Sequence, residues 1–227
     1  MKHILCLCAF LLCNGFMPGP SMLPAAAQTP STASLDSYEA ILEQLEARYN
    51  AADFSADFFQ KSTLKALDIT DTAKGKAWFK HPGMMRWEYE TPENYAIISD
   101  AKTLWIYRPE DNQVVIGDAM AYFSNGKGAS FLSNFKLVQD AYTVSLADPP
   151  DDHHYTLKLV PKQKQMDLSA IFLNIAKESF DIQSVRTLND YGDETHIEFS
   201  DLKFGDLDVS LFQFKMPPGV DILSMDE

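Results

Sequence analysis

The spacing of apolar residues changes from a helical to a strand-like period near residue 54. Between residues 35 and 49, apolar side chains recur every three or four positions, which predicts one amphipathic helix. Asp36 and Glu39 have the spacing of a capping box at its start. From Phe54 onward, apolar and polar residues alternate in short runs separated by turns rich in Pro, Gly, Asp and Asn. This pattern predicts strands, and their short connections favour antiparallel pairing.

The strand pattern continues to residue 216 and is interrupted once. Met120–Phe135 contains Asn125-Gly126-Lys127-Gly128 and then mixes apolar and small residues, which predicts a glycine-hinged loop followed by a short helix. The last predicted strand is Leu211–Met216, ended by Pro217-Pro218-Gly219. About ten strands result, and a curved sheet of that size must close into a barrel or be covered on one face. We therefore expect a mainly β fold in which helices cover a single curved sheet.

The N-terminal residues have the pattern of an export signal. Lys2 precedes an uncharged apolar run at residues 4–16, and Ala25-Ala26-Ala27 fits a cleavage site with small residues. The run is too short to span a bilayer as a helix. We expect residues 1–27 to be a secretory signal peptide and residues 28–227 to be a single exported domain.

Charge and cysteine content narrow the choice of function. The formal net charge is −13, and an acidic protein is repelled by nucleic acid and by anionic membrane surfaces. Simple solubility explains the same charge. All three cysteines, Cys6, Cys8 and Cys13, lie within the predicted signal. The exported domain would then contain no disulfide, no thiol nucleophile and no cysteine-ligated metal.

The sequence contains no residue constellation typical of catalysis. His153 and His154 are adjacent, so in a strand they would point to opposite faces. A metal-binding helix motif and a nucleophile elbow are both missing. Asn125-Gly126-Lys127-Gly128 lacks the spacing of a phosphate-binding loop. We expect a binding protein rather than an enzyme, with no metal and no cofactor.

The aromatic residues carry more information than the charged ones. They make up 12% of the chain, and several fall between residues 78 and 109. An ordinary core could use them, and composition alone favours that interpretation. A concave sheet lined with aromatic rings would also form an apolar cavity, the usual form of a site for an apolar ligand.

The order of these aromatics resembles that of a known family. The stretches Gly75–Pro92 (GKAWFKHPGMMRWEYETP) and Ile98–Pro109 (ISDAKTLWIYRP) are similar to the outer-membrane lipoprotein carrier (LolA) family. Phe54–Gln60 is similar to that family's N-terminal Phe…Phe-x-Gln pattern, and Phe214–Asp221 to its C-terminal signature. The resemblance covers residues 36–223, and its central block is the specific part.

The resemblance implies an unclosed antiparallel β-barrel of about ten or eleven strands under a lid of helices. It implies a monomeric periplasmic chaperone that receives lipoproteins from an ATP-driven inner-membrane complex. The carrier would shield their acyl chains in an apolar cavity and deliver them to an outer-membrane acceptor, without a cofactor or a covalent step. The residues expected to line the cavity and the lid are Phe54, Phe58, Trp78, Met85, Trp87, Tyr89, Trp105, Tyr107, Phe131, Leu132 and Phe135.

Two basic positions are candidates for latching the lid. The family commonly has an arginine at the end of the first aromatic strand, where it holds the lid by hydrogen bonds, and this chain has His81 there. Arg86 matches a different, frequently basic position of the family. Because histidine titrates near neutral pH, a latch made by His81 would depend on pH. An exposed turn histidine without this role explains the residue equally well.

Two other functions stay open. A related binder could carry another lipid or amphiphile, such as a glycolipid. A regulatory sensor with the same fold would need a partner domain, and the single-domain length argues against it.

Overall fold

A computed structural model describes residues 37–124, 132, 136–147 and 151–225 of the chain. The predicted signal peptide, and the predicted lid residues Phe131 and Phe135, lie outside the described residues.

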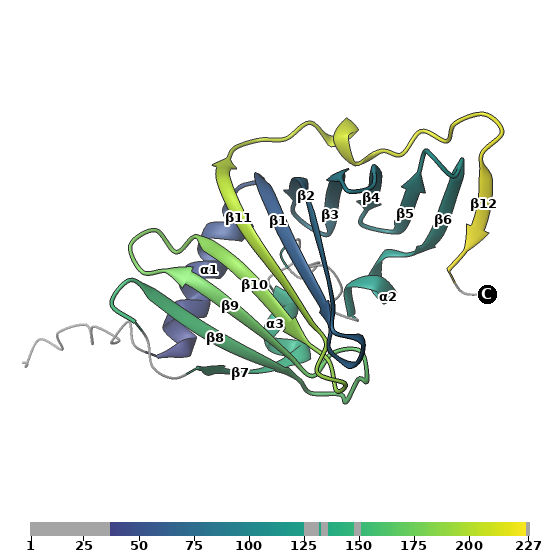
Figure 1. Cartoon of the computed structure of the whole chain (residues 1–227). Helices are drawn as coiled ribbons and strands as arrows, with labels where there is room; N and C mark the ends of the chain where they lie inside the picture. Colours follow the sequence, from purple (N-terminus) through teal and green to yellow (C-terminus); the bar gives the residue numbers. More distant parts are fainter. Residues whose placement is uncertain (1–36, 125–131, 133–135, 148–150, 226–227) are drawn as a thin grey trace, which may run out of the picture. The chain divides into compact units, whose positions relative to one another are not determined.

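The described residues form one sheet of twelve strands (Figure 1). Its spatial order is β12-β6-β5-β4-β3-β2-β1-β11-β10-β9-β8-β7, and every neighbouring pair is antiparallel except β12 with β6. The two edge strands, β12 and β7, do not pair with each other, so the sheet is not closed. The expected mainly β, unclosed fold is confirmed, with one strand more than expected. The strands are β1 Phe54–Leu64, β2 Ile69–Lys80, β3 Met84–Thr91, β4 Tyr95–Asp100, β5 Thr103–Arg108, β6 Gln113–Asp118, β7 Tyr142–Leu146, β8 His154–Pro161, β9 Ala170–Ala176, β10 Ile182–Leu188, β11 Glu194–Phe204 and β12 Asp221–Ser224.

The described α-helices are α1 (Tyr38–Ala51), α2 (Ala119–Ser124) and α3 (Lys136–Ala141). Short 3-10 turns occur at Lys65–Leu67 (η1) and Val209–Phe212 (η3). Within the described part of the chain, no helix has the length and apolar character needed to cross a membrane.

Helix α1 begins one residue later than the capping box predicted. Ser37, and not Asp36, is its N-cap, and the Ser37 Oγ accepts a hydrogen bond from the Ala40 amide at 3.3 Å. The predicted apolar stripe is present, because Ile41, Leu42, Leu45 and Tyr49 are buried.

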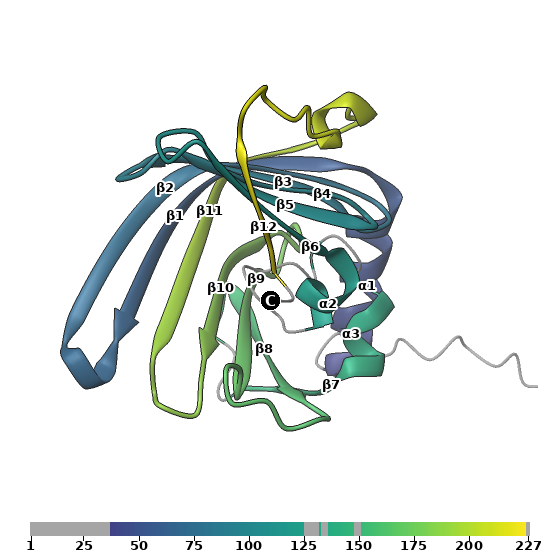
Figure 2. The same ribbon diagram turned by 90° about the vertical axis from the view of Figure 1, so that its right-hand side faces the viewer.

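The core lies between the concave face of the sheet and the helices. Figures 1 and 2 show the sheet curving around α1, α2 and α3. Each helix region contributes to one buried cluster, α1 through four residues and the others through Ala119, Leu132 and Val138. Because strand residues alternate between faces, the strands that contribute to this cluster do so through their inward-facing residues.

The C-terminal region differs from the prediction of a strand at Leu211–Met216. Residues 205–220, here called the strap, form η3 and irregular chain across the outer face of the sheet, and β12 follows (Figure 2). β3 and β4 already have strands on both sides, so the strap cannot join the sheet where it crosses them. It packs by side chains instead: Phe212 is fully buried, and Phe214 lies 5.9 Å from Trp105 and 5.4 Å from Tyr107 between ring centroids.

We predict that Phe212 anchors the strap. Replacing Phe212 with Ala should lower the free energy of unfolding by about 3–5 kcal/mol, the usual cost of removing a buried phenylalanine ring. Urea unfolding followed by circular dichroism measures this. Val209→Ala is the matched control, because Val209 is 49% exposed on the same 3-10 turn. Equal effects of the two substitutions would contradict the anchoring role.

Candidate functional site

A continuous lane of aromatic rings crosses the concave face from α1 to β4. Neighbouring rings along it have centroids 4.1–5.6 Å apart, in stacked or edge-to-face arrangements. The last of them is partly buried, and the others are at most 5% exposed. We call these residues the aromatic lane, and in spatial order they are Tyr49, Phe54, Phe79, Trp87, Phe58, Tyr89 and Tyr95.

Strand alternation and register explain why these rings share one face. Phe58 is 3% exposed on the inner face, whereas its neighbour Phe59 is 45% exposed on the outer face. The register of β2 with β3 sets Ala77 beside Trp87, and the small alanine leaves room for the indole ring. Gly75 is required beside Phe58, because a Cβ there would come within 1.8 Å of the Glu88 carbonyl oxygen.

A bulge in β11 adds two more rings to the lane. Strict alternation would place Phe199 and Phe204 on opposite faces. The register of β11 against β1 shifts between them, and Asp201 there has a positive φ of 52°. As a result Phe199 lies 6.1 Å from Trp87, and Phe204 lies 5.7 Å from Phe54, between ring centroids.

Several polar contacts fix the C-terminal end of α1 to the sheet. The Ile182 amide donates a hydrogen bond to the Tyr49 hydroxyl oxygen at 2.7 Å. The Arg48 guanidinium donates to one carboxylate oxygen of Asp181 through Nη2 and, at 2.9 Å, through Nε. It also lies 4.2 Å from the centroid of the Phe204 ring, a cation–π contact.

At its other end the aromatic lane opens into a polar recess. The Tyr89 hydroxyl donates to Gln60 Oε1 at 3.0 Å, and the Tyr89 ring stacks on Tyr95. The concave face therefore changes from apolar near α1 to polar beside β4. The recess has a volume of about 400 Å³ and is lined by Gln60, Ser62, Asp71, Thr72, Ala73, Pro92, Glu93 and Tyr95.

Burial keeps the tyrosines of the concave face uncharged. Loss of solvent raises the pKa of Tyr49 and of Tyr89 far above the ordinary value of 10, and raises the pKa of Tyr122 on α2 to about 12. These hydroxyls stay protonated at physiological pH.

The structure brings six of the predicted cavity residues together and places three others on the opposite face. Phe54, Phe58, Met85, Trp87, Tyr89 and Leu132 all belong to the buried cluster on the concave side. The outer face carries Trp78, Trp105 and Tyr107 instead. The prediction did not include Phe79, Phe199 or Phe204, although the alternation of β2 could have identified Phe79.

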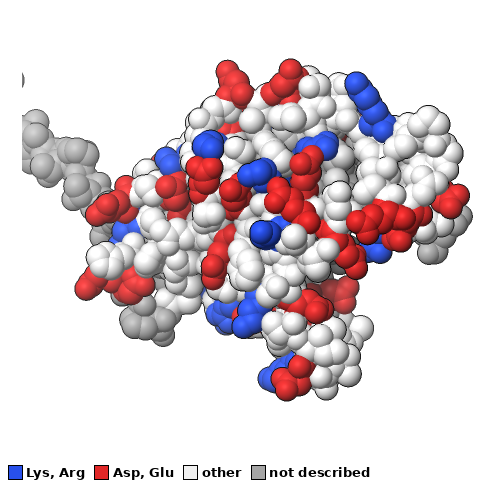
Figure 3. All heavy atoms as spheres, turned by 45° about the horizontal axis from the view of Figure 1, so that its top comes forward, with Lys and Arg blue, Asp and Glu red and all other residues white. Residues whose placement is uncertain are grey.

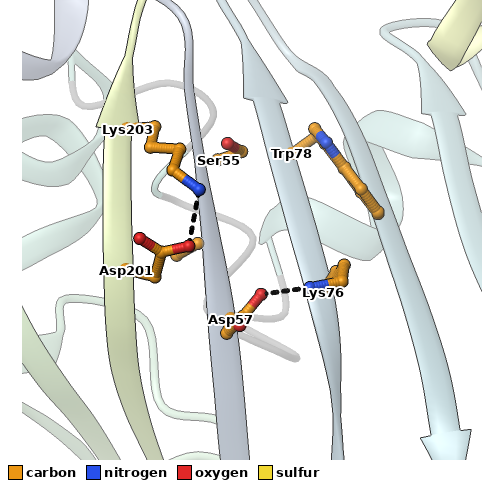
Figure 4. A pocket seen from close by; sticks show the side chains of 7 residues that line it. Ser55, Asp57, Lys76, Trp78, Asp201 and Lys203 are labelled. Carbon is orange, nitrogen blue, oxygen red and sulfur yellow. Dashed lines mark hydrogen bonds and ion pairs between the residues drawn. The ribbon is translucent and has the colours of Figure 1, made fainter.

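Trp78 forms one wall of a small polar pocket on the outer face (Figure 4). Its charged groups are paired with one another, Lys76 with Asp57 and Lys203 with Asp201, each at 2.6 Å. The alternation of β2 explains the position, because Trp78 lies between the inward-facing Ala77 and Phe79.

The two predicted latch residues occupy different surroundings. Arg86 lies on the outer face, where it pairs with Glu88 and donates to the Leu211 carbonyl of the strap at 3.1 Å. His81 lies in the turn between β2 and β3. Arg48 of helix α1, by contrast, pairs with Asp181 in the turn before β10. No pattern in the sequence identifies Asp181 as its partner.

The outer face is charged where the concave face is apolar. Figure 3 shows acidic and basic side chains interspersed over the outer surface that the strap crosses. Among the described residues, no group of three or more His, Cys, Asp or Glu side chains could hold a metal ion. The aromatic lane is therefore the best candidate for a functional site in the described part of the chain.

Comparison with known proteins decides the family. Residues 49–215 match the family model described as outer membrane lipoprotein carrier protein LolA. The chain belongs to this family. An outer-membrane lipoprotein carrier protein of Chromobacterium violaceum is 29% identical over 206 residues, which cover 90% of this chain and 97% of the relative. The carrier of Chromohalobacter salexigens is 25% identical over 202 residues, with 88% and 91% coverage.

Among solved structures, an uncharacterized conserved protein from Thermus thermophilus has the same fold. Its TM-score is 0.54 at 14% identity, and the match covers 82% of this chain and 98% of that protein. Membership of the LolA family confirms the expectation of a lipoprotein carrier and not an enzyme. It also implies a periplasmic location and lipoprotein cargo.

The raised tyrosine pKa values predict a specific alkaline instability. In the unfolded chain a tyrosine ionises near pH 10, whereas buried Tyr89 stays protonated to higher pH. The contribution of Tyr89 to the free energy of unfolding is therefore fully present below pH 10 and is lost as the pH rises further. Tyr89→Phe should make the fall in unfolding free energy shallower, by about half of 1.4 kcal/mol per pH unit at pH 10 and by nearly the full amount at pH 11. Denaturant unfolding between pH 9 and 11 measures the slope, and identical slopes would contradict a buried hydroxyl.

Proposed function

We propose that the aromatic lane and the buried cluster around it hold the acyl chains of lipoproteins while the protein carries them across the periplasm. The observation that supports this most is that the rings form one connected, buried stripe covered by helices. A stripe of this kind offers an acyl chain continuous apolar contact. The charged outer face would keep the loaded carrier in solution.

The energetics of a lipid carrier fit this arrangement. Each acyl methylene exposed to water costs about 0.8 kcal/mol, so a lipidated protein needs cover in order to leave a membrane. A carrier must also release its cargo at the acceptor. In the structure the helices pack on the same apolar surface that an acyl chain would contact, so closing the lid competes with binding. That competition limits affinity and permits transfer.

We infer that the lid opens at α2 and α3, while α1 stays in place. The Arg48–Asp181 pair and the Tyr49 hydroxyl tie α1 to β10 and to the turn that precedes it. Helices α2 and α3 have six residues each and contribute Ala119 and Val138 to the cluster. Helices this short are marginal by themselves and depend on packing, so they are the parts most easily displaced. Whether His81 latches them stays a prediction.

Membership of the family supports a proposal for the route of the cargo. Residues 1–27 would direct export and be removed, which leaves residues 28–227 as the carrier. We propose that an ATP-driven inner-membrane complex loads the carrier and that an outer-membrane acceptor unloads it. A monomer suffices for this exchange, because one concave face holds one set of acyl chains.

Substitution on the two faces of β1 tests the proposed function. Phe58→Gln, on the aromatic lane, should reduce the extraction of an acylated lipoprotein from spheroplasts at least tenfold, because it places an amide in the apolar stripe. Phe59→Gln, one residue further on the outer face, should extract like the unmodified protein. The measurement is the lipoprotein recovered in the soluble fraction with each purified carrier.

Thermal melts of both variants show whether each is folded at the assay temperature. The proposal is wrong if the unmodified protein extracts no lipoprotein under conditions in which the Chromobacterium violaceum carrier does. Mass spectrometry of ligands bound to the unmodified protein would then identify another lipid or amphiphile as the cargo.

A further inference from the structure

One buried polar atom on the aromatic lane, the indole nitrogen of Trp87, makes no hydrogen bond among the described residues. Trp87 is 2% exposed, and its indole Nε1 has no hydrogen-bond partner among the described residues. A buried N–H group without a partner is unfavourable, and such groups in native proteins usually have a partner that is absent or a functional role. The same position could be filled by phenylalanine without this cost.

The neighbours of Trp87 do not replace the missing acceptor. Its ring is edge-to-face with Phe58 at 4.8 Å and with Phe79 at 5.6 Å between centroids. An N–H group directed at an aromatic ring gains only a weak interaction compared with a carbonyl oxygen. The Tyr89 hydroxyl, on the next inward-facing residue of β3, donates to Gln60 and does not accept from the indole N–H.

The position of Trp87 along the aromatic lane indicates which chemical group could accept its hydrogen bond. On one side lie the apolar rings of Phe79 and Phe54, which lead to α1. On the other side lie Tyr89 and Tyr95, which lead to the polar recess. Trp87 thus stands at the change from apolar to polar surface. An acyl chain has its carbonyl group at the corresponding point, between the hydrocarbon and the headgroup.

We propose that the Trp87 indole N–H donates a hydrogen bond to an acyl carbonyl of the cargo and so selects acyl lipids over other apolar chains. The hydrocarbon would lie toward α1, and the headgroup or peptide would lie toward the recess. This inference rests on the proposed function, since it concerns the cargo of the same site. It adds a specificity that an apolar surface alone cannot provide, because hydrocarbon contacts do not distinguish an ester from an ether.

A matched pair of short lipids tests the proposal. Diheptanoylphosphatidylcholine carries two ester carbonyls, and diheptyl ether phosphatidylcholine has methylene groups in their place. The ether is the more apolar of the two, so without a hydrogen bond it should bind at least as well. We expect the unmodified protein to bind the ester about fivefold more tightly, the range of one neutral hydrogen bond. Isothermal titration below the micelle concentration gives both affinities.

Variants show whether the preference belongs to the indole N–H. Trp87→Phe should abolish the preference for the ester, while Trp105→Phe, the same substitution on the outer face, should retain it. A purely structural role for Trp87 would weaken both lipids equally and leave their ratio unchanged, which would overturn the proposal. Equal binding of the two lipids to the unmodified protein would overturn it as well.

A measurement on the unmodified protein avoids any folding defect of the variant. With ¹⁵N-labelled tryptophan, the Nε1–H resonance of Trp87 should shift downfield when the ester binds and should not do so with the ether. The same shift with both lipids would contradict a hydrogen bond to the carbonyl. If neither lipid binds at all, the proposed function fails together with this inference, whereas equal binding of both leaves the proposed function standing.

Discussion

An unclosed curved sheet has an apolar concave face that it cannot cover with its own strands, and the rest of this structure follows from that constraint. The inward-facing residues of the strands would be exposed to water without α1, α2 and α3. In a closed barrel the strands themselves would keep this apolar surface away from water at all times. Helices would cover this surface reversibly if, as proposed, an acyl chain takes their place. The same apolar surface therefore serves as the core of the empty protein and as the proposed site of the loaded one.

The helices over the concave face are held by different sets of contacts, and this difference is the basis of the proposed opening at α2 and α3. The end of α1 is held by an ion pair, a cation–π contact and a backbone hydrogen bond. The short helices α2 and α3 contribute fewer residues to the buried cluster, Ala119 and Val138. Helix α3 is also held by Lys162, which donates hydrogen bonds to the Gln139 and Ala141 carbonyls. The outer face has a separate cover, the strap, which Phe212 and the Arg86 contact with Leu211 hold in place. The strap packs on the outer face, so the proposed opening of the concave side would not require it to move.

The sequence predicted the fold class and about half of the residues in the candidate site, and the reason is physical. The period of two in the strands is a local property, and the family resemblance supplied the lack of closure. The same alternation places Trp78 and Phe79 on opposite faces of β2. The sequence prediction grouped the aromatic residues of this region together and did not apply the alternation to them. The bulge at Asp201 and the pairing of Arg48 with Asp181 depend on contacts between distant parts of the chain, which no local pattern contains. The strap looked like a strand because its apolar residues alternate, yet the positions beside β3 and β4 were already occupied.

Contact between an acyl chain and the aromatic lane is the central claim, and quenching of tryptophan fluorescence by a brominated acyl chain tests it most directly. In a Trp78→Phe/Trp105→Phe double variant, Trp87 is the only tryptophan left. A brominated fatty acyl lipid should quench its emission on binding, because the bromine atoms lie against the ring. The Trp87→Phe variant, whose two remaining tryptophans are both on the outer face, should show little quenching. Quenching of the outer tryptophans with unchanged Trp87 emission would contradict the account.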